Sequence, residues 1–278
     1  QNNNQIIQYM FSEFLNSYSK TLIMGILNVT PDSFYDGTDN IDSSYLKNKF
    51  KELILSDIID IGAESSRPGS DKIDIHDEIS RLKKILPLIK ENNHLYSIDT
   101  YKAKIAEFAL NNGFNIVNDI TGGKCANLLE IVSDKNAPII LMHMQGNPKT
   151  MQHNPRYNNI IEDILDFFDK RINKCVKYGI RLEDIIIDPG IGFGKTISDN
   201  DLLIRKLDKF KKFNLPLLVG ISRKSFLSIN DNKPKDRLNS SLSIGSIAIN
   251  NGADILRVHD VKKSINVFSL VDRILNKV

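Results

Sequence analysis

The most informative segment of this chain is Ile185-Ile186-Ile187-Asp188-Pro189-Gly190-Ile191-Gly192-Phe193-Gly194-Lys195. Three apolar β-branched residues without a polar face predict a short strand that is buried on both sides. Asp188 would then stand at the carboxyl end of that strand. The glycines that follow permit positive φ angles and let the backbone approach a ligand closely. By itself, a carboxylate in this position suits a turn or cap residue as well as a ligand-binding group.

The chain repeats this arrangement, in which a short apolar run ends in polar residues. The eight runs are 22–29, 58–61, 95–98, 115–117, 138–142, 185–188, 215–221 and 255–258. Helical patterns lie between them, and Pro87 interrupts one, so we expect a kink or a helix end there. Alternating strands and helices predict an α/β fold with a parallel sheet, and eight such units predict a (β/α)8 TIM barrel in a single domain.

Size and composition agree with one globular domain. The chain has 278 residues, of which 41% are hydrophobic and 26% charged. The net charge of +3 does not indicate a nucleic-acid partner. The sequence has no apolar run of membrane length and no signal-peptide pattern. Cys125 and Cys175 match no metal or redox spacing. We therefore expect a cytoplasmic protein that binds neither nucleic acid nor membrane.

Two regions differ in character along the chain. Residues 1–20 predict an N-terminal extension or linker with a short helix, because a polar start precedes a few apolar residues at helical spacing. Residues 21–278 hold all eight strand–helix units and form the predicted barrel. The chain begins at Gln1 rather than Met, which leaves room for a processed product or a domain of a longer protein.

The polar residues at the predicted strand ends are of two kinds. Asp99, Asn118 and Asp188 supply carboxylates and an amide, which suit a neutral heterocycle with several N–H donors and a carbonyl. The alternative is that each caps the helix that follows, although Thr100 already offers a cap after Asp99. His143 fits a core histidine as well as a ligand contact.

The second kind is cationic and comes from three different strand ends. Its members are Arg67, Arg223, Lys224, Arg257 and His259. In a barrel they would converge on one face, where a cluster of cations near helix N-termini forms an anion site. The alternative is a set of scattered surface charges, which their positions next to buried apolar runs disfavour.

Gly194-Lys195-Thr196 is similar to the end of a phosphate-binding P-loop. That motif needs glycine where this chain has Pro189, and it needs a helix that starts at the lysine. Residues 197–199 look like continued loop instead. The sequence therefore disfavours a nucleotide hydrolase.

Several segments together resemble the dihydropteroate synthase family, in the family's order from the first strand to the last. They are GILNVTPDSF at 25–34, GAESSRPG at 62–69, SIDT at 97–100, NDI at 118–120, MHM at 142–144, DPGIGFGK at 188–195, SRK at 222–224 and RVHD at 257–260. The resemblance implies a (β/α)8 barrel that condenses (7,8-dihydropterin-6-yl)methyl diphosphate with 4-aminobenzoate and releases diphosphate, in folate biosynthesis. Mg²⁺ is the implied cofactor.

The resemblance also implies roles for individual residues. The pterin-binding residues would be Asp99, Asn118, Asp188 and Lys224. Asn28, Arg257 and His259 would bind the diphosphate, with Asn28 also a ligand of Mg²⁺. The aminobenzoate-binding residues would be Ser66, Arg67, Pro68, Phe193, Lys224 and Ser225. The loops 30–41 and 65–77 would close over the site and bring Asp36 to the reacting carbon. Catalysis would rest on Asp36, Arg257, His259 and Lys224.

This chain departs from the family pattern in both loops. Ser66 stands where the family usually has threonine, and Tyr35 and Thr38 stand where smaller residues are common. No functional group is lost, but Ser66 lies where sulfonamide drugs would compete, so sensitivity to them does not follow from the resemblance. The family also implies a homodimer through helices near the C-terminus and allows fusion to an upstream folate-pathway domain.

Two other functions share part of this pattern. A pterin-binding barrel that transfers a methyl group would need Asp99, Asn118 and Asp188, but not the Asn28 loop or the pair of Arg257 and His259. A non-catalytic scaffold homologue would tolerate the loss of catalytic residues, and none of the expected ones is missing. Both alternatives therefore rank below the synthase.

Overall fold

The computed structural model describes residues 19–30, 43–64, 72–229 and 233–277. Within them, eight parallel strands form one sheet in the order β6-β5-β4-β3-β2-β1-β8-β7. The strands are β1 Leu22–Asn28, β2 Ile58–Gly62, β3 Leu95–Asp99, β4 Ile116–Asp119, β5 Ile139–Met142, β6 Ile185–Asp188, β7 Leu218–Gly220 and β8 Ile255–Val258. A bridge between Ile187 and Leu217 joins the two edges of the sheet. The predicted (β/α)8 barrel is confirmed.

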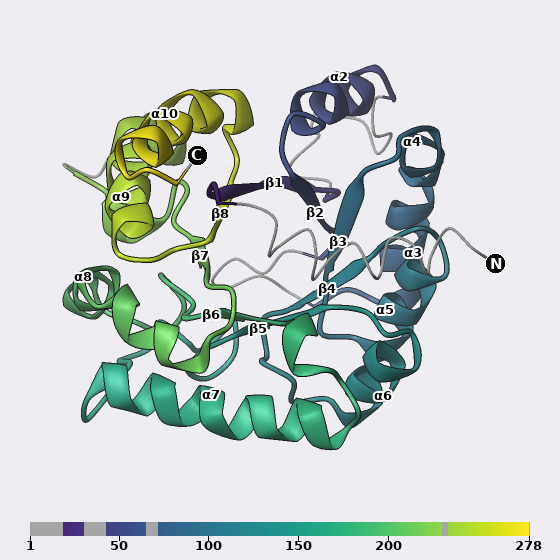
Figure 1. The fold of residues 1–278 in the computed structure, drawn as a ribbon. Coiled ribbons are helices and arrows are strands. Elements are labelled where there is room, and N and C mark those ends of the chain that lie inside the picture. The colour runs from purple at the N-terminus through teal and green to yellow at the C-terminus, as the bar shows by residue number, and fades with distance from the viewer. Residues whose placement is uncertain (1–18, 31–42, 65–71, 230–232, 278) are drawn as a thin grey trace.

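Helices surround the strands as an outer ring (Figure 1). The α-helices of the described residues are α2 Ser43–Leu53, α3 Ile75–Lys83, α4 Leu86–Glu91, α5 Ala103–Leu110, α6 Ala126–Asp134, α7 Ile160–Lys177, α8 Ile197–Arg205, α9 Leu238–Asn250 and α10 Val261–Ile274. Short 3-10 turns are η2 Leu182–Asp184, η3 Leu207–Phe213, η4 Ser225–Leu227 and η5 Pro234–Arg237. None of these helices combines the length and apolar character that crossing a bilayer requires.

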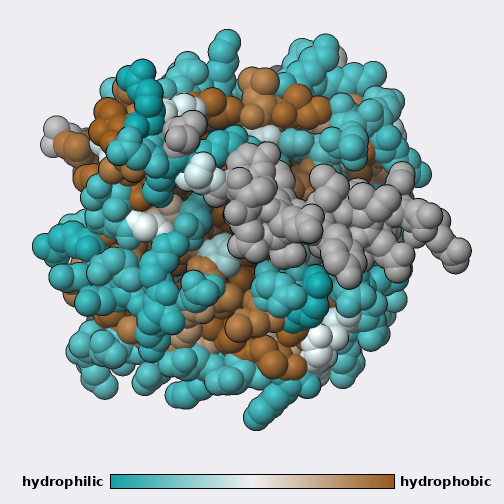
Figure 2. Space-filling view, in the orientation of Figure 1, coloured by the Kyte–Doolittle hydropathy of each residue, from teal (hydrophilic) through white to brown (hydrophobic). Residues whose placement is uncertain are grey.

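Helix α7 illustrates how local sequence builds the ring. The Asn159 side chain accepts hydrogen bonds from the N–H groups of Ile161 and Glu162 and so caps the first turn. The buried residues of α7 recur at helical spacing from Ile160 to Cys175 and face the core. Polar residues dominate the outline of the molecule, as the space-filling view shows (Figure 2).

The interior of the barrel is divided along its axis. Near the amino ends of the strands it is filled by Leu22, Met24, Ile58, Ile116, Ile140, Ile186, Leu218 and Ile255. A larger apolar cluster lies between the strands and the helices. Because the inner layer closes the amino end of the barrel, polar side chains that point inward can gather only toward the carboxyl end.

Some local expectations change in the structure, and residues 1–18 of the predicted extension lie outside the described part. Pro87 falls in the first turn of α4, after α3 has ended, so the predicted helix end is confirmed. Thr100 does not cap α5, because Lys102 holds the N-cap position and the Thr100 hydroxyl accepts from the Lys102 N–H instead. The prediction of continued loop after Thr196 is wrong, because Thr196 and Asp199 form a capping box that starts α8.

The start and the end of the barrel are joined by one carboxylate. Asp272 on α10 accepts hydrogen bonds from the Thr21 N–H at 2.9 Å and from the Thr21 hydroxyl at 2.7 Å. Both residues are buried. A buried donor that loses its partner destabilises the fold by the full cost of its desolvation. This contact therefore helps to hold β1 against the last helix.

We expect Asp272→Ala to lower the free energy of unfolding by about 2–4 kcal/mol, because two buried donors on Thr21 lose their acceptor. Thr21→Val removes only the hydroxyl and should lower it by about 1 kcal/mol. Urea denaturation measures both changes. Equal stabilities for Asp272→Ala and the parent chain would contradict a role for this contact.

Candidate active site

The inward-facing residues of the strands change from apolar to polar toward their carboxyl ends. Side chains two apart on a strand face the same side. Asp60 therefore follows Ile58, Asn118 follows Ile116, Asp188 follows Ile186 and Arg257 follows Ile255, each apolar partner lying in the inner layer. Asp99 is paired with Asn118 in the sheet register. The polar residues predicted at separate strand ends thus point into one space above the apolar layer.

Arg257 holds two of these carboxylates together. Its Nε donates to Asp60 Oδ2 at 2.6 Å, and its Nη2 donates to Asp99 Oδ2 at 2.9 Å. Asn118 Nδ2 donates to the same Asp60 oxygen at 3.1 Å. Asp60 thereby orients the guanidinium of Arg257 and the amide of Asn118, both of them predicted site residues. Because Arg257 Nη1 makes no hydrogen bond within the described residues, it stays available to a ligand.

Asp60 was not among the predicted site residues, although the sequence holds a signal for it. It is a carboxylate inside an apolar run, between Ile59 and Ile61, and it is fully buried. Charged residues are rarely buried unless they are paired. Its position two residues after an inward-facing isoleucine would have placed it in the barrel. Its Oδ1 atom has no hydrogen-bond partner within the described residues.

Burial sets the proton affinities of the site. Desolvation raises the pKa of Asp99 to about 7, although the charge of Arg257 opposes the shift. Desolvation also raises the pKa of Asp188. It lowers the pKa of Lys224 to about 8, while the Asp188 carboxylate works against that change. Acids and bases in this pocket therefore change protonation closer to neutrality than they do in water.

Asp188 acts both as a turn residue and as an open acceptor. Its Oδ1 accepts the N–H of Gly190 at 2.7 Å. Its second oxygen accepts no hydrogen bond from the described protein. Gly190 has a φ of 68°, and a Cβ atom there would lie 1.9 Å from the His143 carbonyl oxygen. The turn therefore requires glycine, and Asp188 is a turn residue whose second oxygen remains open to a ligand.

Lys195 stabilises the glycine-rich turn through hydrogen bonds to its carbonyl oxygens, and its ammonium is thereby occupied within the protein. Its buried Nζ donates to the carbonyl oxygens of Gly190 at 2.8 Å and Phe193 at 2.9 Å, and it lies 3.1 Å from His143 Nδ1. His143 is itself buried and packs edge-on against Phe167. The Lys195 ammonium is used within the protein, which agrees with the prediction that this segment is not a P-loop. His143, buried beside it, is a core residue.

Lys224, after β7, lies against the same turn. Its Nζ is 4.5 Å from the centre of the Phe193 ring and donates to the Ile191 carbonyl. The next residue, Ser225, begins η4 and is exposed. Lys224 and Phe193 therefore form one wall of the site, with a cation over an aromatic face.

The predicted cation cluster is only partly assembled. Arg223 has a φ of 61° and forms a two-pronged ion pair with Asp260, at 3.0 and 2.7 Å, so it supports the loop and does not add charge to the site. His259 receives structural support from Ser222, whose Oγ accepts its N–H at 3.2 Å and lies 3.1 Å from its Nδ1. Asn28 ends β1, opposite Gly62 in the register. Asp36, Ser66, Arg67 and Pro68 lie outside the described residues.

The comparisons with known proteins agree on one family. Residues 24–259 match the family model described as pterin binding enzyme. The dihydropteroate synthase of Escherichia coli K12 is 39% identical over 259 residues, which cover 91% of this chain and 92% of that protein. The bifunctional dihydropteroate synthase/dihydropteroate reductase of Helicobacter pylori is 42% identical over 89% of this chain and 66% of its own length. The solved structure of Yersinia pestis dihydropteroate synthase with a sulfonamide drug complex superposes with a TM-score of 0.86, at 37% identity, over 93% of this chain and 95% of that one.

We expect strong energetic coupling between Asp60 and Arg257 in a double-mutant cycle of Asp60→Asn and Arg257→Met. The coupling should be about 1.5–3 kcal/mol of unfolding free energy, because the pair is largely buried and its hydrogen bond is charged at both ends. The exposed pair of Lys212 and Asp169, 3.3 Å apart, serves as the control and should couple by about 0.5 kcal/mol or less. Additive effects at Asp60 and Arg257 would contradict the network.

Proposed function

The chain belongs to the dihydropteroate synthase family, enzymes that transfer a pterinylmethyl group in folate biosynthesis, and on this premise we propose how its own residues divide the work. The observation that carries the proposal is the buried network of Asp60, Asp99, Asn118 and Arg257 at the carboxyl end of the barrel. It holds acceptors, donors and a cation in fixed positions, as a site that binds a heterocycle next to an anion requires.

The pterin would bind to Asp99, Asn118, Asp188 and Lys224. The open oxygen of Asp188 suits the N–H donors of the pterin ring, because an unpaired carboxylate oxygen in a buried site gains most from a hydrogen bond. The Lys224 ammonium, next to it, suits the carbonyl or a ring nitrogen. Asp60 would not touch the pterin but would keep Asn118 in position.

The diphosphate would bind to Asn28, Arg257 and His259. Arg257 Nη1 and the His259 ring offer donors, and fixed donors of this kind stabilise the charge that builds up on a leaving diphosphate. The Asn28 side chain makes no hydrogen bond with the described residues, so its amide oxygen is free to act as a ligand. Mg²⁺ prefers oxygen ligands and takes only one or two from the protein when phosphates supply others. Asn28 therefore fits the Mg²⁺ of the family, which when bound would neutralise charge on the diphosphate.

The 4-aminobenzoate would bind beside the pterin, against Phe193 and Lys224. Phe193 offers an aromatic face and Lys224 a cation, which suit a flat ring that carries a carboxylate. Ser66, Arg67, Pro68 and Ser225 would complete the pocket. Arg67 in particular would provide a second cation for the carboxylate.

The reaction forms one carbon–nitrogen bond and breaks one carbon–oxygen bond. The arylamine nitrogen attacks the methylene carbon of the pterin, the diphosphate leaves with the electron pair, and the nitrogen then loses a proton to solvent or to the diphosphate. An arylamine is unprotonated at neutral pH, so a strong general base is not needed. Asp36 would stabilise positive charge on the methylene carbon, and alignment of the two substrates would supply a large share of the rate.

Further properties belong to the same proposal. A homodimer through the C-terminal helices is supported by exposed apolar residues there, Ile247 on α9 and Leu270 and Ile274 on α10. A fused folate-pathway domain is supported by the bifunctional relatives from Helicobacter pylori and Haloferax volcanii. A cytoplasmic location is supported by the two free cysteines. Competition by sulfonamides at the aminobenzoate pocket is the last of these proposals.

The synthase activity is tested by mixing the protein with the dihydropterin diphosphate, labelled 4-aminobenzoate and Mg²⁺. We expect labelled 7,8-dihydropteroate, its loss on addition of EDTA, and its return with excess Mg²⁺. Product that persists in EDTA would overturn the Mg²⁺ proposal alone. Pterin binding without product would instead favour a methyltransferase or a scaffold.

Asp188→Ala should abolish measurable pterin binding, because it removes the open acceptor and leaves Lys224 without its facing carboxylate. Loss of a charged hydrogen bond in a buried site reduces affinity by about 10–100-fold or more. Titration calorimetry with a pterin measures the effect, and Asp201→Ala, on the exposed face of α8, is the control. Unchanged affinity in Asp188→Ala would remove Asp188 from the pterin pocket.

A further inference from the structure

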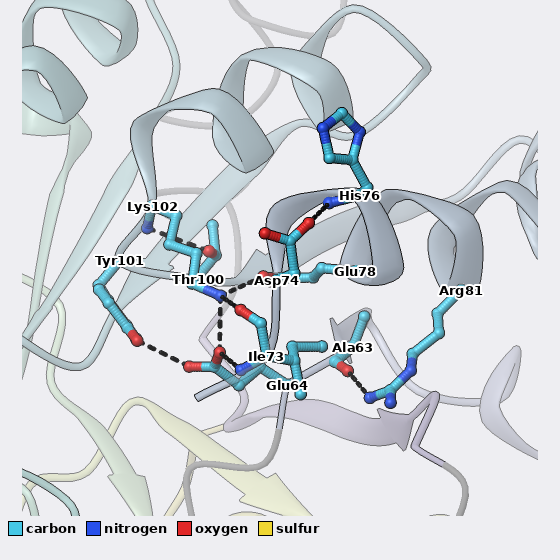
Figure 3. Close-up of polar contacts among 10 residues, drawn as sticks. All are labelled: Ala63, Glu64, Ile73, Asp74, His76, Glu78, Arg81, Thr100, Tyr101 and Lys102. Carbon is cyan, nitrogen blue, oxygen red and sulfur yellow. Dashed lines mark hydrogen bonds and ion pairs between the residues drawn. The ribbon is translucent and has the colours of Figure 1, made fainter. Parts of the chain in front are cut away.

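A second polar cluster lies beside the site, around Lys102 (Figure 3). The Lys102 ammonium donates to Glu64 Oε2 at 2.6 Å, to Glu78 Oε2 at 2.8 Å and to the Ile73 carbonyl oxygen at 2.9 Å. Glu64 also accepts the Ile73 N–H at 2.9 Å and the Tyr101 hydroxyl at 2.8 Å. We call Glu64, Ile73, Glu78, Tyr101 and Lys102 the Lys102 cluster. The function proposed above uses none of its members.

The charges of the cluster are largely withdrawn from solvent. The side chains of Lys102, Glu64 and Glu78 are 14%, 11% and 1% exposed. Burial raises the pKa of Glu78, whereas the hydrogen bonds from Lys102, Ile73 and Tyr101 outweigh burial and lower the pKa of Glu64. Two buried carboxylates thus share one ammonium. Removal of one partner of a buried ion pair leaves an uncompensated charge, so the geometry of this cluster is strongly constrained.

The cluster joins two points that are nine positions apart in the chain. Glu64 follows β2, and Ile73 precedes α3, yet both bind Lys102 and each other. Two neighbouring contacts also hold these two points in place. Arg81 of α3 donates to the Ala63 carbonyl at 2.8 Å, and Asp74 caps α3 by accepting the His76 N–H at 2.8 Å. Glu64, after β2, and Ile73, before α3, are therefore held together beside the barrel.

The Lys102 cluster adjoins the pterin side of the site. Lys102 lies three residues after Asp99, and a cleft is lined by Glu64, Asp99 and Tyr101 together. Lys102 itself is turned toward Glu64, Ile73 and Glu78 (Figure 3). All of its donors serve the cluster, so its effect on substrates must pass through the residues that it holds.

We propose that Lys102 is a positioning residue for the aminobenzoate half-reaction: by binding Glu64, Ile73 and Glu78, it anchors both ends of the chain between β2 and α3 and so sets the affinity for 4-aminobenzoate. The proposal rests on the aminobenzoate roles proposed for Ser66, Arg67 and Pro68, which lie between the anchored ends. Residues that are fixed in advance lose less conformational entropy when a ligand binds, and here the fixed residues are Glu64 and Ile73. The affinity for the pterin should not depend on it.

The kinetic test compares Lys102→Met with Lys104→Met, an exposed lysine on the first turn of α5. We expect the KM for 4-aminobenzoate to rise by about tenfold or more in Lys102→Met, because the charged hydrogen bonds from Lys102 to Glu64 and Glu78 are lost. The KM for the pterin substrate and kcat at saturation should change by less than about twofold. Lys104→Met should match the parent chain. Equal increases in both KM values would overturn the positioning role.

A second measurement examines the anchor without enzyme activity. Lys72 Nζ lies 5.6 Å from the centre of the Tyr101 ring. Trypsin cleavage after Lys72 therefore reports opening of the Lys102 cluster. Cleavage should be faster in Lys102→Met than in the parent chain and Lys104→Met. Faster cleavage with an unchanged aminobenzoate KM would overturn the proposal and leave the synthase function intact. Absence of product from the parent chain would instead count against the proposed function, while the cleavage rates would still test the anchor.

Two further variants separate positioning from stability. In Lys102→Met/Glu78→Gln one unpaired buried carboxylate is neutralised, so the melting temperature should recover in part while the aminobenzoate KM stays high. Tyr101→Phe removes only the hydroxyl that donates to Glu64 and serves if Lys102→Met does not fold. It should raise the same KM by about twofold to fivefold. A folded Tyr101→Phe with parental KM and cleavage rate would overturn the proposal.

Discussion

The ion pairs of Arg257 with Asp60 and Asp99 are the constraint on which the rest of the site depends. These residues come from β8, β2 and β3, and they are separated by 197 and 158 positions in the chain. Buried charges are unfavourable by several kcal/mol each unless they are paired. The pairs can form only when β8, the last strand, has paired with β1, because β1 lies between β8 and β2 in the sheet. Pairing of the last strand with the first and assembly of this network are therefore one event.

The division of the barrel interior explains why the site is so compact. The amino half is filled by aliphatic side chains, which exclude water from below. The carboxyl half holds the charged and amide groups, and the low dielectric beneath them strengthens each interaction. Charges held in this way need little reorganisation when a leaving group develops its own charge. The same inward-facing positions that stabilise the fold in one layer thus hold the polar groups of the candidate site in the next.

Two lysines beside the site, both largely withdrawn from solvent, bind backbone carbonyls and carboxylates. Lys195 holds the glycine-rich turn through the carbonyls of Gly190 and Phe193. Lys102 holds the start and the end of the connection between β2 and α3. An ammonium group can satisfy three acceptors that converge from different segments. It is therefore well suited to fix a turn that contains few side chains of its own.

The sequence by itself determined the barrel and most of the strand-end residues, because a buried strand is a local apolar run and its carboxyl end is marked by the first polar residue. It did not reveal that Arg223 pairs with Asp260, that Lys195 binds carbonyls, or that Asp60 orients Arg257 and Asn118. Partners far apart in the chain leave no local signal, and only the closed barrel decides which charges meet. A capping box such as that of α8 was legible in the sequence, whereas the sharing of Lys102 by Glu64 and Glu78 depends on three elements packed in space.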